Sequence, residues 1–97
     1  MVIVYIDRLE EFGWKHADAR TSLKNWIDAV DLAIWESKQD VLETFPKAKM
    51  IANNRARFEI LHNKYRLIIQ IDYEDSWVEV RFIGTHKEYD RINPEII

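Results

Sequence analysis

The sequence contains no cysteine, only two glycines and two prolines, and no long apolar run. Without cysteine the chain can form neither a disulfide framework nor a thiolate metal site, and a reducing cytoplasm is compatible with it. Residues 1–12 lack a basic segment, and their apolar run is far too short for a signal peptide or a membrane span. We therefore expect a soluble, cytoplasmic protein without a membrane partner.

The chain also lacks the composition of a disordered protein. It has 97 residues, of which 47% are hydrophobic and 32% are charged. This length suffices for one modest core but not for two, and no repeat, linker or low-complexity tract divides the sequence. We expect a single domain that spans residues 1–97.

An excess of positive charge is missing as well, since the formal net charge is −3. Nucleic-acid-binding domains usually carry a basic excess, so the total alone argues against that class. The distribution alters this judgement: residues 1–46 hold five Lys or Arg against nine acids, whereas residues 47–66 hold six against one. A local basic cluster steers anionic ligands even on an acidic protein, although the same residues also fit an ordinary solvated face.

Hydrophobic spacing predicts helices in the first half of the chain. Residues 2–6 form a short apolar run typical of a buried strand. From about residue 18 to residue 36, apolar side chains recur at three- and four-residue spacing, which favours one long helix. The members of this stripe are Leu23, Trp26, Ile27, Val30, Ala33 and Ile34. A further, short helix should begin near Ser37 and end before Pro46, because proline disfavours helical geometry at the preceding residue.

The period changes to two in the second half, which indicates strands. Residues 50–52, 57–61, 64–73 and 77–84 alternate between apolar and polar side chains and are separated by polar turns. Gly84 is expected to end the last strand. The pattern predicts an α+β fold in which N-terminal helices pack on one face of a mostly antiparallel sheet.

Alternation also assigns the faces of this sheet. The apolar positions, including Val78, Val80 and Phe82 on the last strand, are expected to face the helices. Arg57, Arg66 and Arg81 then share the opposite face. Guanidinium groups suit bidentate phosphate contacts, so this face is a candidate seat for an RNA backbone. Equally, the arginines can form surface salt bridges with nearby acids, namely Glu59, Asp72 and Glu79.

Groups able to transfer protons follow the last strand. RNA cleavage without a metal needs a base for the 2′-hydroxyl, an acid for the leaving oxygen and cations on the phosphate. His86 is the best single candidate because a free imidazole titrates near pH ~6.5, and Tyr89 is the second. Lys87 and Arg66 supply charge at the reacting phosphate, and four further cations can hold flanking phosphates: Lys49, Arg55, Arg57 and Arg81. A lone histidine after a strand is, however, more often structural.

Three segments carry a family resemblance: RFIGTHKEYD, KYRLIIQIDY before it and DVLETFP further upstream. Together they resemble the HigB toxins of type II toxin–antitoxin modules, within the RelE-like superfamily of mRNA-cleaving ribonucleases. The resemblance implies a RelE-like fold, cleavage of mRNA on the ribosome by 2′-hydroxyl attack, and inhibition of translation. It places Arg66, His86, Lys87 and Tyr89 at the catalytic positions. It also implies a HigA-like antitoxin with a helix-turn-helix as partner.

Other kinds of site find no support in the sequence. The three histidines, His16, His62 and His86, do not have a zinc-binding spacing, and no glycine-rich phosphate loop is present. We therefore expect no metal and no cofactor. The rival hypothesis is a non-catalytic interaction module that uses the same basic face to bind an antitoxin or the ribosome without cleaving RNA.

Overall fold

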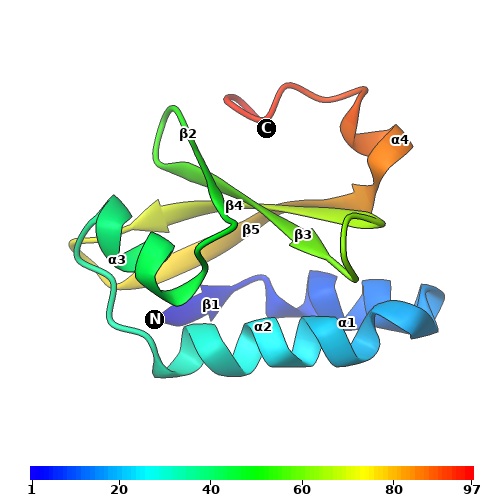
Figure 1. Ribbon diagram of the computed structural model, residues 1–97, viewed down its shortest axis with the longest axis horizontal. Coiled ribbons are helices and arrows are strands. Elements are labelled where there is room, and N and C mark those ends of the chain that lie inside the picture. The colour runs from blue at the N-terminus through cyan, green and yellow to red at the C-terminus, as the bar shows by residue number, and fades with distance from the viewer.

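The computed structural model describes all residues from 1 to 97 and shows the two longest helices on one side of a five-stranded sheet (Figure 1). In Figure 1, α1 and α2 lie below the sheet, and the C-terminal segment lies above it. The elements are β1 (Val2–Val4), α1 (Ile6–Lys15), the 3₁₀ turn η1 (Ala17–Ala19), α2 (Arg20–Leu32), α3 (Lys38–Thr44), β2 (Lys49–Ile51), β3 (Arg55–Ile60), β4 (Tyr65–Asp72), β5 (Trp77–Thr85) and α4 (His86–Tyr89). The predicted α+β class is confirmed.

The sheet has the strand order β1-β5-β4-β3-β2. Strands β2 to β5 form an antiparallel meander, while β1 pairs with β5 in parallel over three positions. Beyond the end of β1, the Nη1 of Arg8 in α1 donates a hydrogen bond to the Val80 carbonyl of β5 at 3.1 Å. The sheet is thus open, with short strands at both edges.

The main core lies between the sheet and the helices. From the helices it takes Leu9, Phe12, Leu23, Trp26 and Val30, all buried. The strands contribute the side chains that alternation assigned to this face, among them Phe58, Ile60, Leu67, Ile69, Ile71, Val78 and Val80. Ile68 is also fully buried but lies outside this cluster, since it points to the opposite face of β4. We call that opposite face the outer face.

The prediction that Phe82 faces the helices is wrong. The register of β4 with β5 shifts between Ile68 and Ile69, so that Ile68 pairs with Phe82 whereas Ile69 pairs with Val80. This β-bulge leaves Arg81 as an extra residue in β5 and turns Phe82 onto the outer face beside Ile68. A one-residue shift reverses the facing of everything after it, so Ile83 takes the inner place opposite Leu67.

Two predicted boundaries also differ from the structure. The long helix α2 ends at Leu32, because Ala33 adopts an extended backbone with φ −79° and ψ 150°, and Ile34 is therefore exposed. Strand β5 does not end at Gly84 but continues to Thr85. The glycine has a steric function instead, since a Cβ at this position would lie 2.7 Å from Phe82 Cζ.

A short helix that the sequence pattern did not indicate follows β5. Thr85 caps α4: its side chain accepts the Glu88 N–H at 3.2 Å, and the Glu88 carboxylate accepts the Thr85 N–H at 2.9 Å. This reciprocal pair is a capping box. Residues 90–97, here called the strap, then return across the outer face of the sheet (Figure 1). No helix in the structure has the length and hydrophobicity that crossing a membrane requires.

We predict that Ile69→Ala destabilises the fold by about 2–5 kcal/mol, because it removes a fully buried side chain from the centre of the sheet. Chemical denaturation followed by tryptophan fluorescence measures the free energy of unfolding. Ile96→Ala is the matched control, because Ile96 is 72% exposed and should change stability by less than about 0.5 kcal/mol. Equal effects of the two substitutions would contradict the described core.

A second prediction concerns the capping box. Hydrogen bonds from Thr85 lower the pKa of the Glu88 carboxyl, the backbone N–H contributing most. Because the folded pKa is the lower one, the carboxylate stabilises the fold above the unfolded value of ~4.3, and this contribution is lost as the pH falls through the folded pKa. In Thr85→Ala the Glu88 pKa should rise only in part, because the backbone N–H that contributes most is kept, and stability should fall by about 1 kcal/mol through the loss of the hydroxyl cap.

An NMR titration of the Glu88 carboxyl group measures this shift. Thr85→Ser, which keeps the hydroxyl, should retain the low pKa. An unchanged Glu88 pKa in Thr85→Ala would show that the Thr85 hydroxyl does not contribute to the shift.

Candidate nucleic-acid interface

The centre of the outer face is a cluster of two arginines around Tyr89. The guanidinium carbons of Arg57 on β3 and Arg66 on β4 each lie 5.7 Å from the centroid of the Tyr89 ring. The Phe82 ring lies 6.3 Å from the same ring, which places Tyr89 beside the side chain that the β-bulge turns to the outer face. Adjacent strands and α4 therefore bring two cations and a phenol together, as a phosphate-binding or phosphate-cleaving site requires.

Hydrogen bonding in this cluster is incomplete. Arg66 is 7% exposed, and its Nη1 donates to Glu59 Oε1 at 3.0 Å. The Nε atoms of both Arg57 and Arg66 are buried and have no hydrogen-bond partner. Buried donors without partners are rare in folded proteins, and sites that bind a ligand are one place where they occur.

His86 lies at the start of α4, three residues before Tyr89, so the two side chains are neighbours on one helical turn. Its Nδ1 is 3.4 Å from Asp90 Oδ2, and its side chain is 55% exposed. This carboxylate can orient the imidazole and leave Nε2 free toward solvent. Lys87 is exposed and forms no ion pair. His86 and Lys87 thus border the Tyr89 cluster rather than sit inside it.

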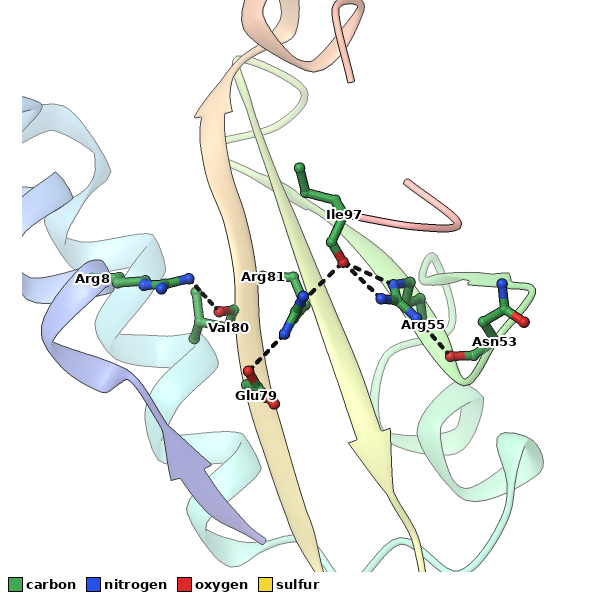
Figure 2. Close-up of polar contacts among 7 residues, drawn as sticks. All are labelled: Arg8, Asn53, Arg55, Glu79, Val80, Arg81 and Ile97. Atoms are coloured by element: carbon green, nitrogen blue, oxygen red, sulfur yellow. Dashed lines mark hydrogen bonds and ion pairs between the residues drawn. The ribbon is translucent and has the colours of Figure 1, made fainter. Parts of the chain in front are cut away.

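The remaining predicted RNA-binding residues extend the basic surface along the sheet. Lys49 is exposed on edge strand β2 and pairs in register with Arg57. Arg55 and Arg81 lie on the same outer face, and both donate hydrogen bonds to the main-chain oxygen of Ile97 in the strap (Figure 2). The structure therefore brings the eight predicted site residues to one face and its rim, in two groups centred on Tyr89 and on Ile97.

The sequence left open whether Arg57, Arg66 and Arg81 contact phosphate or form surface salt bridges. Two of the three form salt bridges in the structure. Arg66 pairs with Glu59 at 3.0 Å, and Arg81 pairs with Glu79 at 2.7 Å. Asp72 pairs with no arginine and instead accepts the Asp75 N–H. Arg57 forms no ion pair, so no neighbouring acid compensates its charge.

A further polar cluster beside the N-terminus of α4 was not anticipated from the sequence. The Tyr65 hydroxyl donates to Asp18 Oδ1 at 2.7 Å, Lys64 pairs with Asp18 Oδ2, and His16 Nδ1 lies 3.4 Å from the same hydroxyl. The hydrogen bond from Lys64 is the main cause that lowers the pKa of Asp18, and the Asp18 carboxylate raises the pKa of Tyr65. This cluster ties η1 to β4 directly below the start of α4, since Tyr65 pairs with Thr85 in the sheet.

Asp90 was likewise missed as a partner of His86. The two residues have the i, i+4 spacing of a helical ion pair, but that signal is useful only once α4 is known to be a helix. No group of three His, Asp or Glu side chains is placed to hold a metal ion.

No match was found among curated proteins. The family model of HigB toxins, described as the RelE-like toxic component of a toxin–antitoxin system, matches residues 19–92. The matched range runs from the start of α2 through α4 and includes all eight predicted site residues. It also includes the β-bulge and the whole antiparallel meander. The chain therefore belongs to the HigB toxin family and is a RelE-like toxin whose partner is an antitoxin.

Proposed function

We propose that this toxin is an endoribonuclease that cleaves mRNA by metal-independent attack of the 2′-hydroxyl on the adjacent phosphate. The observation that carries the proposal is the convergence of Arg57 and Arg66 on the Tyr89 ring, each at 5.7 Å. The family to which the chain belongs supports the toxin role, and the outer face supplies cations where a phosphodiester would lie. The products are a 2′,3′-cyclic phosphate and a free 5′-hydroxyl.

The arginines are suited to the charge that builds up in this reaction. Attack of the 2′-oxygen adds negative charge to the phosphate oxygens, and fixed cations stabilise the transition state more than the substrate. Arg66 is held by Glu59 and by burial, so its position does not have to be organised during the reaction. Arg57 lacks an acidic partner and is free to contact the phosphate.

In the proposed reaction, residues of α4 transfer the protons. His86 and Tyr89 lie three residues apart in α4, and one of them would take the 2′-hydroxyl proton while the other protonates the 5′-oxygen. Asp90 would act as a positioning residue, because its carboxylate lies 3.4 Å from the imidazole Nδ1. Lys87 adds positive charge at the same end of the sheet.

The ribosome is the proposed place of cleavage. The chain has a net charge of −3, and Glu59 and Glu79 offset two of its outer-face arginines. Such a surface binds free RNA weakly, because non-specific affinity depends on the number of phosphates that cations neutralise. A ribosome would position the message and remove the need for strong binding. The antitoxin partner is proposed to be HigA-like, with a helix-turn-helix.

One observation favours the alternative of a non-catalytic module. The His86 side chain is more than half exposed and lies at the rim of the Tyr89 cluster. A protein that only blocks the ribosome or binds its antitoxin needs the basic face but no proton transfer. Mapping of RNA ends separates the two functions.

We predict that His86→Asn lowers cleavage by about 10²–10⁴-fold if the imidazole transfers a proton. Arg66→Gln should lower it by about 10²–10³-fold through the loss of charge at the transition state. Expression of each variant, followed by growth curves and primer extension on cellular mRNA, measures both effects. New 5′ ends spaced by codons in the wild type would identify ribosome-dependent cleavage.

His62→Asn is the matched control, because His62 is exposed in the β3–β4 turn and outside the Tyr89 cluster. Its φ of 60° suits asparagine, so the control should fold and cleave normally. Growth arrest without new RNA ends would favour the non-catalytic module. Full cleavage by His86→Asn would remove His86 from the mechanism.

A further inference from the structure

The strap places one of its main-chain oxygens at the point where two arginines converge. The Ile97 oxygen accepts hydrogen bonds from Arg55 Nη2 at 2.7 Å, Arg55 Nε at 3.2 Å and Arg81 Nε at 3.0 Å (Figure 2). Arg55 is 8% exposed, and its Nη1 donates to the Asn53 carbonyl at 3.1 Å, which fixes the guanidinium in place. Three N–H groups from two cations thus form a preformed site for an oxygen atom.

The N–H groups that hold the Ile97 oxygen also suit a phosphate oxygen. Guanidinium groups bind phosphates through charge-assisted, often bidentate hydrogen bonds, which are about twice as strong as neutral ones. Arg55 and Arg57 lie two residues apart on β3, about 7 Å along the strand, and both point to the outer face. The Ile97 oxygen is therefore held by the arginine that lies one outward-facing position along β3 from Arg57.

Apart from its contact with the two arginines, the strap makes few contacts with the sheet. None of residues 90–97 is buried, and Ile96 is 72% exposed. Besides the arginine contacts, one side-chain hydrogen bond ties the strap to the sheet, from Asn53 Nδ2 to the Glu95 carbonyl at 2.9 Å. The turn at its end is internal, with Ile96 and Ile97 N–H donating to the Asn93 carbonyl. Segments with few buried apolar contacts and exposed hydrogen bonds open at low free-energy cost.

We propose that Arg55 and Arg81 form a phosphate subsite for the RNA backbone, which the strap closes with the Ile97 oxygen when no RNA is bound. The ligand class rests on the proposed function, since RNA is the substrate proposed there. Binding exchanges the strap oxygen for a phosphodiester oxygen, and Arg81 keeps its ion pair with Glu79 throughout. The strap thereby weakens the binding of RNA by the free toxin.

The test uses a variant that loosens the strap without touching the arginines. Asn53 has a φ of 64°, so Asn53→Gly keeps the backbone conformation and removes only the hydrogen bond to Glu95. The neighbouring Asn54→Gly is the matched control, since Asn54 has a φ of 59° and no side-chain bond to the strap. Fluorescence anisotropy with a labelled 2′-O-methyl single-stranded RNA measures affinity. Because this RNA cannot be cleaved, the result is independent of nuclease activity.

We expect Asn53→Gly to bind the RNA about 3- to 10-fold more tightly than the wild type, the range that one net hydrogen bond supports. Arg81→Gln should bind more weakly and reduce the salt dependence by about 0.7 in logarithmic slope, the value for one phosphate on a single strand. Arg91→Gln, an exposed charge in the strap, serves as the charge control. Circular dichroism confirms that each variant is folded.

Three results would overturn the proposal: equal or weaker binding by Asn53→Gly, an unchanged salt slope in Arg81→Gln, or no binding by any variant. Each of these can occur while the wild type still cleaves mRNA in cells, so failure of the subsite is distinguishable from failure of the nuclease function. Conversely, a tighter Asn53→Gly complex without any cleavage in cells would support the strap and reject the nuclease.

Discussion

The arrangement of the outer face depends on one extra residue in β5. The bulge at Arg81 lets Val80 stay in the main core while Phe82 turns away from it and pairs with Ile68. Everything beyond the bulge is thereby reversed, including Gly84, whose lack of a side chain leaves room for the Phe82 ring. Helix α4 then starts where Tyr89 can pack near Phe82 and between two arginines. Without the bulge, Phe82 would take the inner place opposite Leu67 that Ile83 now holds, and the Tyr89 ring would lose its contact with Phe82.

Charge on this face is balanced locally rather than accumulated. Glu59 and Glu79 each pair with one arginine, and the Ile97 oxygen accepts hydrogen bonds from Arg55 and Arg81. Arg57, which lies next to Tyr89, has no acidic partner. The acidic total charge of the chain and a row of arginines on its outer face are therefore compatible.

Sequence periodicity predicted the parts of the fold in which packing is regular. The alternation in residues 65–72 and the stripe formed by Leu23, Trp26 and Val30 indicated the correct faces because each repeats over several positions. The face of Phe82 was predicted wrongly, since a bulge changes register without changing the apolar content of a strand. Helix α4 was missed because four residues carry no helical period. The arginines were identified by type and face, and Glu59 and Glu79 were among the acids named as their possible partners. The contact with the distant Ile97 depends on folding that no local pattern encodes.

The hydrogen bond from Arg8 to the Val80 carbonyl has a consequence for the edge of the sheet. Strand β1 spans only Val2–Val4, and the acceptor beyond it would otherwise be open to a strand from another molecule. The guanidinium occupies that acceptor and places a charge there. A strand from another molecule would have to displace this side chain and extend a ladder of three residues. Edge-to-edge aggregation is therefore disfavoured on this side, even for toxin that has been released from its antitoxin.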